Sequence, residues 1–178
     1  HDIGEGMRSV RVGPWGGRQV LLLGVKRGVV VYDLENKQKR VYPLPDIKQP
    51  RGGVNSVAVH GNSLFATHSE FGLALWDLEH PGRPAELLYD SITAGQKTTR
   101  GVHVASDRLL FASGTHVYGI VLSDLSSAPV LYRGSHGLVS SVTCAGPALY
   151  ASTEEGTILQ WDLKQPDYPS VLLKKNDP

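Results

Sequence analysis

The stretch GLALWDL, residues 72–78, decides the fold of this 178-residue chain. It opens on a glycine, runs through aliphatic residues and ends on Trp-Asp-Leu, which is typical of a short strand entered from a tight turn. Similar stretches end at three other Asp-Leu pairs. The full set is GVVVYDL ending at Leu34, GLALWDL at Leu78, GIVLSDL at Leu125 and GTILQWDL at Leu163. The chain is therefore predicted to be a repeat protein.

The spacing of these copies indicates the size of the repeat. The aspartates Asp33, Asp77, Asp124 and Asp162 are separated by 44, 47 and 38 residues. That range suits a repeat of four short strands and is longer than ankyrin or TPR repeats. The glycines that open the copies, Gly28, Gly72, Gly119 and Gly156, favour the positive φ of a hairpin turn.

Apolar runs on both sides of each copy predict its partner strands. Two runs precede it, such as SVAV from Ser56 and SLFATH from Ser63, and a more polar run follows it, such as AELLY from Ala85. No 3.6-residue periodicity with helix caps interrupts this pattern, and Pro and Gly recur at the joints. We therefore predict an all-β fold of sixteen strands in four antiparallel four-stranded sheets. The predicted repeats cover about residues 7–50, 51–98, 99–136 and 137–178 of a single domain.

Composition excludes several classes of function. The formal net charge is +1, so the chain lacks the clustered basic charge expected of a nucleic-acid-binding domain. Its longest apolar runs are strand-sized, so no membrane span is predicted. The single cysteine, Cys144, replaces a valine of the other repeats and is interpreted as a small apolar residue. Neither the cysteine nor the seven histidines have metal-ligand spacing, and we predict no metal and no cofactor.

Several of these residues resemble the tryptophan-aspartate (WD) repeat family of β-propellers. Trp76-Asp77 and Trp161-Asp162 end the third strand of their repeats, and Tyr32-Asp33 and Ser123-Asp124 hold the same place in the others. Ser-Val pairs in the first strand add to the likeness, which covers about Met7 to Leu173. The Gly-His pair that opens repeats of the family survives only as Ser135-His136. The resemblance implies that each sheet is a propeller blade.

The resemblance also implies which residues are structural and what the protein does. Trp76, Asp77, Trp161, Asp162, Asp33 and Asp124 are expected to hold the blades together. His136, Ser152 and Asp162 resemble a hydrolase triad by residue type, but in the family such residues form a structural hydrogen-bonded network. We therefore predict a non-catalytic scaffold for proteins or peptides. The alternative is a propeller that binds or processes a small ligand, such as a glycan, at its central channel.

One set of residues is predicted to bind the partner. Arg8 and Arg100 stand at equivalent places at the start of the first strand, and Arg51 and His136 precede that strand by a few residues. In the family these places lie around one opening of the central channel, where Phe71 and Tyr118 are expected in neighbouring turns. Guanidinium groups there suit an acidic or phosphorylated peptide. The alternative is that these arginines only end their strands in water.

The number of blades raises the question of closure. Rings of this family have seven or eight blades, so four blades would leave an apolar face bare at each end. Residues 1–50 carry nine Lys/Arg and five Asp/Glu, whereas residues 137–178 carry three and five. This contrast permits a homodimer that closes an eight-bladed ring head to tail. The alternatives are a longer chain, to which the absence of a starting Met at His1 points, and a four-bladed ring.

Overall fold

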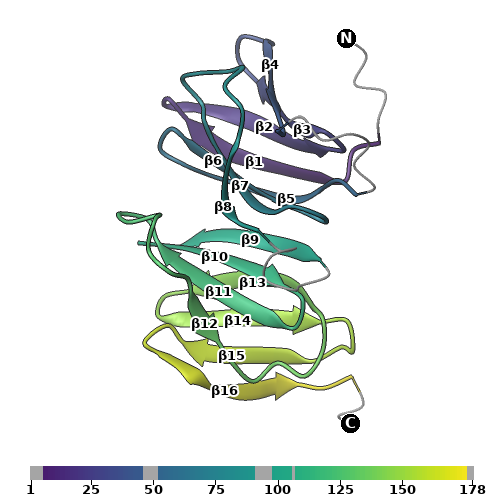
Figure 1. The fold of residues 1–178 in the computed structure, drawn as a ribbon, viewed down its shortest axis with the longest axis vertical. Helices are drawn as coiled ribbons and strands as arrows, with labels where there is room; N and C mark the ends of the chain where they lie inside the picture. Colours follow the sequence, from purple (N-terminus) through teal and green to yellow (C-terminus); the bar gives the residue numbers. More distant parts are fainter. Residues whose placement is uncertain (1–5, 46–51, 91–97, 106, 176–178) are drawn as a thin grey trace. The chain divides into compact units, whose positions relative to one another are not determined.

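A computed structural model describes residues 6–45, 52–90, 98–105 and 107–175. Within these ranges the chain forms sixteen strands in four antiparallel four-stranded sheets and no helix (Figure 1). In each sheet the strands follow one another in chain order. The prediction of an all-β chain of four such sheets is confirmed. No helix in this part of the chain is long and apolar enough to cross a membrane.

The first two sheets occupy the N-terminal half of the chain. The first comprises β1 (Ser9–Trp15), β2 (Arg18–Val25), β3 (Gly28–Asp33) and β4 (Lys39–Pro43). The second comprises β5 (Val54–His60), β6 (Ser63–His68), β7 (Gly72–Asp77) and β8 (Glu86–Tyr89).

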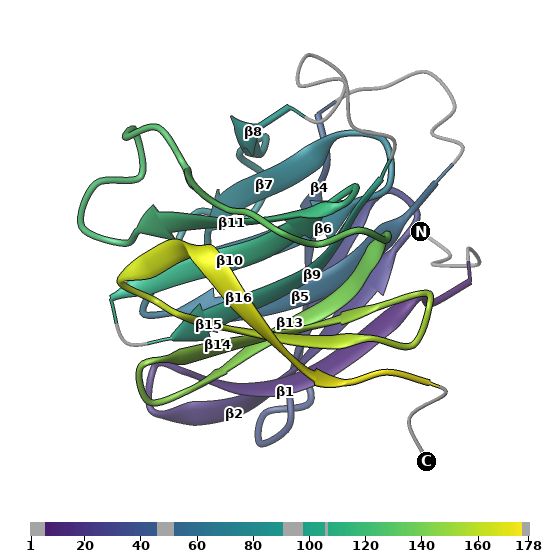
Figure 2. The same cartoon turned by 90° about the horizontal axis from the view of Figure 1, so that it is seen from below.

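The other two sheets occupy the C-terminal half. The third comprises β9 (Thr99–Ala105), β10 (Arg108–Ser113), β11 (His116–Val121) and β12 (Val130–Tyr132). The fourth comprises β13 (Val139–Ala145), β14 (Ala148–Thr153), β15 (Ile158–Asp162) and β16 (Gln165–Leu173). The last strand, β16, is yellow in Figure 2 and forms the outer edge of its sheet.

The chain divides into two compact units, residues 1–99 and 100–178, and each unit has its own core. In the first unit, Leu22 and Val31 of the first sheet pack against Leu64 and Trp76 of the second. In the second unit, Leu110 of the third sheet belongs to the same buried cluster as the apolar residues of the fourth. Successive side chains of a strand point to opposite faces, and β6 and β10 each bury five consecutive residues, so side chains on both faces of these inner strands are buried.

The third repeat departs from the predicted alignment. Asp124-Leu125 was expected to end its third strand, but β11 ends at Val121. The amide of Leu122 donates to the carbonyl of Asp107, just before β10, as those of Leu78 and Leu163 donate to Asn62 and Pro147, just before β6 and β14. Val121 and Leu122 therefore hold the places of Asp77 and Leu78. The Asp-Leu pair is shifted by three residues, and Gly119 lies within the strand instead of opening it.

A turn and a close contact explain this shift. The β10–β11 hairpin turns at Gly114, whose φ of 60° requires the left-handed conformation. Gly119 instead faces Tyr132, whose ring atom Cε2 would lie 3.1 Å from a Cβ built there. The glycine that sequence reasoning assigned to a turn is thus needed for packing.

One face of the first sheet is apolar and exposed. Val10, Val12 and Val41 are 68%, 56% and 48% exposed. Register places Val10 level with Val57 and Val142 of the second and fourth sheets, which are both buried. In those two sheets the equivalent face packs against the preceding sheet of the same unit. The first sheet has no preceding sheet among the described residues.

Candidate functional site

Two tryptophans join neighbouring sheets in the same way. The indole Nε1 of Trp76 donates to the carbonyl of Pro43, and that of Trp161 donates to the carbonyl of Arg133, each at 2.7 Å. Both side chains are about 1–2% exposed. Because a buried indole needs an acceptor for its N–H, these bonds fix where each sheet meets the one before it. We infer a packing role for both tryptophans.

Tyrosines that sequence reasoning missed complete this contact. The hydroxyl of Tyr42 donates to the carbonyl of Leu78 at 2.8 Å, and that of Tyr132 donates to Leu163 at 3.1 Å. Burial raises the pKa of both phenols, so both stay protonated donors. Each tyrosine lies on the last strand of one sheet and bonds the sheet that follows. We call this pair of hydrogen bonds the Trp–Tyr latch: the indole donates to the preceding sheet, and the phenol donates to the following sheet.

Three of the predicted structural aspartates shape the turn after the third strand. Carboxylates of Asp33, Asp77 and Asp162 each accept the backbone N–H two residues later, at 2.8–2.9 Å. Hydrogen bonds hold the pKa of both Asp33 and Asp77 below the usual value. The largest cause is the backbone N–H of Asn36 for Asp33 and the backbone N–H of Glu79 for Asp77. These aspartates stabilise the turn that leads to the outer strand.

Asp124 does not belong to that set. It lies three residues beyond the end of β11, where its carboxylate accepts a hydrogen bond from the hydroxyl of Ser126 at 2.7 Å. Its backbone carbonyl accepts one from the hydroxyl of Ser127. The prediction that Asp124 matches the aspartates of the other repeats is wrong, because Val121 takes that place.

Four of the predicted partner-binding residues, Arg8, Phe71, Arg100 and His136, lie at what we call the hairpin-turn end of the sheets, where the first strand begins and the second turns into the third. In the first unit Arg8 precedes β1, and Phe71 lies in the turn before β7, as expected. The Arg8 side chain runs along the backbone of Gly53, where a Cβ would meet it at 2.6 Å. Lys26 and Arg27 form the neighbouring β2–β3 turn. This end of the first unit is therefore basic.

A buried histidine supports the Phe71 side chain. His68 is fully buried, and its ring stacks on Phe71 with 4.5 Å between centroids. Its Nδ1 accepts the Glu70 backbone N–H at 3.1 Å, so Nε2 carries the proton and faces the Lys26 carbonyl at 3.3 Å. Burial is the largest cause that lowers the pKa of His68, and the Arg8 charge adds to it. Sequence reasoning missed this residue, although its place before the turn was visible.

In the second unit the hairpin-turn end carries both signs of charge. Arg100 donates to the carboxylate of Glu154 across the sheets. Arg100, which was predicted to bind an acidic partner, is thus already paired with Glu154 of the same unit. Arg51 lies outside the described residues.

His136 lines a hollow of about 520 Å³ in the same unit. Glu155 and Lys174 contribute charges, and Leu159 and Val171 contribute apolar surface. The hollow is bounded by the segment before β13, the β14–β15 turn and β16. Its volume is within the range of small-molecule sites.

Tyr118 is not in a turn. It lies within β11, opposite Phe111, and the two rings stack with 5.3 Å between centroids. The three-residue shift of the third repeat explains the error, since Thr115 holds the place of Phe71. Tyr118 therefore packs within its own sheet instead of at the hairpin-turn end.

Groups that suggested catalysis have other partners. The hydroxyl oxygens of Ser152 and Ser140 are hydrogen-bonded at 2.9 Å. The carboxylate of Asp162 accepts the backbone N–H of Lys164 in the turn after β15. Burial raises the pKa of Cys144 to about 11, so its thiol is protonated at neutral pH. Across the described ranges no group of three or more His, Cys, Asp and Glu side chains is placed to hold a metal ion.

Comparisons with known proteins bear on the fold. The sequence matches no family model. It matches no curated protein either. Among solved structures it is similar to the computationally designed protein Ika8, with a TM-score of 0.68 and 13% identity over 94% of this chain and 48% of that one.

Two other structures are similar to a comparable degree. The designed protein Ika4 has a TM-score of 0.65 and 10% identity over 89% of this chain and 92% of that one. A chain of a nidogen–laminin complex has a TM-score of 0.63 and 13% identity, with 82% and 56% covered. The chain thus spans about half the length of Ika8 and nearly all of Ika4. At these identities the likeness concerns the fold alone, and it supports a β-propeller-like arrangement of sheets.

Proposed function

We propose that this protein is a non-catalytic scaffold of the WD-repeat propeller type that binds an acidic or phosphorylated peptide. The observation that carries the proposal is the basic hairpin-turn end of the first unit. There Phe71 stacks on the buried His68, the Arg8 charge and the Lys26 carbonyl act on that histidine, and Lys26 and Arg27 form the β2–β3 turn at the same end. A supported aromatic ring beside guanidinium groups offers both an apolar anchor and charge-assisted hydrogen bonds.

Arg8 is the best residue to substitute in a test of this proposal. Arg100 is paired with Glu154, so its substitution would also leave a carboxylate without its partner. Binding of fluorescently labelled hexaglutamate and of a phosphoserine peptide can be followed by anisotropy. We expect Arg8→Glu to weaken binding at least tenfold, and the triple change of Arg8, Arg51 and Arg100 to Glu to abolish it.

A matched control separates position from net charge. Lys39→Glu makes the same change of charge at the opposite end of the first sheet and should leave binding within twofold. Unchanged binding by the folded Arg8→Glu protein, or an equal loss in Lys39→Glu, would remove the proposal.

A small ligand is the second candidate, and the hollow beside His136 favours it. Its mixture of charged, hydroxyl and apolar lining suits a small polar molecule. A thermal-shift panel of sugars, metals and phosphopeptides would reveal such a ligand, because only a true ligand raises the melting temperature with concentration. His136→Ala should then remove the shift while the melting temperature of the free protein stays the same.

We further propose that the sheets form part of a closed ring completed by a second copy of the chain. The exposed Val10 of the first sheet lies on the face that the second and fourth sheets bury at Val57 and Val142. The positive charge of residues 1–50 and the negative charge of residues 137–178 favour contact between the first sheet of one copy and the last sheet of another. Two copies joined in this way would supply eight blades. The alternatives are further blades of a longer chain and a four-bladed ring.

A further inference from the structure

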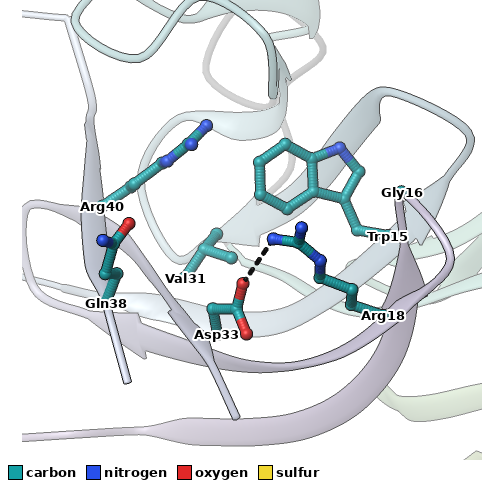
Figure 3. A pocket seen from close by; sticks show the side chains of 7 residues that line it. All are labelled: Trp15, Gly16, Arg18, Val31, Asp33, Gln38 and Arg40. Atoms are coloured by element: carbon teal, nitrogen blue, oxygen red, sulfur yellow. Dashed lines mark hydrogen bonds and ion pairs between the residues drawn. The ribbon is translucent and has the colours of Figure 1, made fainter. Parts of the chain in front are cut away.

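A second hollow lies at the other end of the first sheet. It has a volume of about 120 Å³, and Val31 lines its floor and Trp15 one wall (Figure 3). It is far along the strands from Arg8, since Trp15 ends β1 and Arg8 precedes it. A ligand site here is therefore separate from the basic end around Arg8. Its other lining residues are Gly16, Arg18, Asp33, Gln38 and Arg40.

The acid among the lining residues, Asp33, already accepts four hydrogen bonds. Asp33 accepts hydrogen bonds from the backbone of Glu35 and Asn36 at 2.9 and 3.0 Å. It also accepts the Asn36 side-chain amide at 3.0 Å and the Arg18 guanidinium at 3.2 Å. With two oxygens and four donors, Asp33 is ionised and satisfied, and it already neutralises Arg18 (Figure 3).

Arg40 supplies the remaining positive charge of the hollow. Its guanidinium carbon lies 4.9 Å from the centroid of the Trp15 ring. A cation–π contact uses the face of the guanidinium, and one N–H of Arg40 also donates to the Tyr42 hydroxyl, so a ligand would bind through the others of its five N–H donors. The stacking thus holds the guanidinium in place for a ligand, which lowers the entropy cost of binding.

The second sheet has a hollow at the same position, but Glu86 stands there in place of Arg40. Register puts Arg40 opposite Val31 and Glu86 opposite Leu75. The corresponding hollow of the second sheet is lined by Asp77, Glu79 and Glu86 with Arg83. It would repel an anion, so the basic character belongs to the first sheet and not to the repeat in general.

We propose that the hollow of the first sheet binds the carboxylate of an acidic side chain from a partner peptide. The carboxylate lies on the outer edge of Arg40 beside the Gln38 amide, and its methylene stem packs on Trp15 and Val31. A volume of 120 Å³ equals roughly four water molecules in the liquid, which suits a carboxylate with one or two methylenes.

The Trp15 indole provides a direct readout. The chain has three tryptophans, and Trp76 and Trp161 are buried and hydrogen-bonded, so their indole N–H signals in a ¹H–¹⁵N NMR spectrum serve as internal references. The Trp15 signal is assigned by its loss in Trp15→Phe. The capped amino acid N-acetylglutamate amide should shift that signal saturably at millimolar concentration. The uncharged isostere N-acetylglutamine amide should not.

Two variants make the test specific. Arg40→Gln should weaken the response at least tenfold, whereas Lys39→Gln, which removes the same charge from the adjacent residue of β4, should leave it within twofold. Unmoved Trp76 and Trp161 signals show that the variants are folded. An equal shift with the glutamine compound, or a shift retained in Arg40→Gln, overturns the proposal. A response to inorganic phosphate at lower concentration than to the carboxylate overturns the choice of ligand.

Discussion

At the scale of single residues, His68 makes the stability of the protein depend on pH. Its Nδ1 accepts the Glu70 N–H, so a proton added there would remove the acceptor and place a charge in a buried site. Its folded-state pKa is therefore below the unfolded value of about 6.5. The unfolded chain binds the proton more readily, and the stability that neutral His68 contributes is present above about pH 6.5 and declines as the pH falls below it.

We predict that the melting temperature falls less between pH 7 and pH 5 in His68→Gln than in the parent. His60→Gln is the control, because His60 is exposed at the end of β5. Thermal melts followed by circular dichroism at both pH values measure the difference. Parallel losses in the parent and in His68→Gln would show that protonation of His68 is not what destabilises the fold.

Cys144 is predicted to be unreactive. Burial raises the pKa of its thiol to about 11, and the thiolate is the nucleophile in alkylation. At pH 8 roughly one thiol in a thousand is then ionised, against about a quarter for an unperturbed cysteine. Iodoacetamide labelling followed by mass spectrometry should be slow in the folded protein and fast in urea. Rapid labelling of the folded chain would contradict the raised pKa of this half-buried thiol.

At the scale of elements, the Trp–Tyr latch sets the stability of each unit. We predict that Trp76→Ala or Trp161→Ala costs about 3 to 5 kcal/mol of unfolding free energy, because each change leaves a cavity and removes a buried hydrogen bond. Urea denaturation measures the loss. Trp15→Ala is the control, since Trp15 is only partly buried, and it should cost clearly less. Parental stability in either core variant, with loss of a ligand, would mean that the residue binds instead of packs.

The phenol half of the latch can be tested without a cavity. Tyr42→Phe keeps the ring but leaves the Leu78 carbonyl without its donor, which should cost about 1 to 2 kcal/mol. Tyr132→Phe should behave alike through Leu163. Tyr32→Phe, on the exposed face of the first sheet, is expected to be nearly neutral. If all three variants unfolded at one urea concentration, the two hydrogen bonds would contribute little.

At the scale of the whole molecule, closure by a second copy predicts the mass in solution. Light scattering at micromolar concentration should give about twice 19.3 kDa. Replacing the exposed Val10 and Val12 by Lys should yield a folded monomer, because it places charge on the face that the second copy would cover. The same change to Lys made at Leu34 and Leu87, which are 44% and 43% exposed and lie after β3 and on the outer strand β8, should leave the mass unchanged. A compact monomer of the parent would refute the dimer and favour a four-bladed ring.

The sequence by itself determined the all-β class, the number of strands and their order within each sheet. These features depend on alternation and turn residues within about ten positions of one another, and such signals are local. It also placed Trp76, Trp161 and three of the four Asp-Leu aspartates at equivalent positions. Arg8 and Phe71 lie at the hairpin-turn end as expected.

Only the tertiary structure decided the rest. The shift of the third repeat follows from a turn at Gly114 and from the ring of Tyr132 against Gly119, and neither contact can be read from an Asp-Leu pair. The pairing of Arg100 with Glu154 joins residues 54 positions apart. The Trp–Tyr latch and the stacking of Arg40 on Trp15 likewise join different strands. Contacts of this kind depend on how the strands meet in space, and one-dimensional spacing does not specify that.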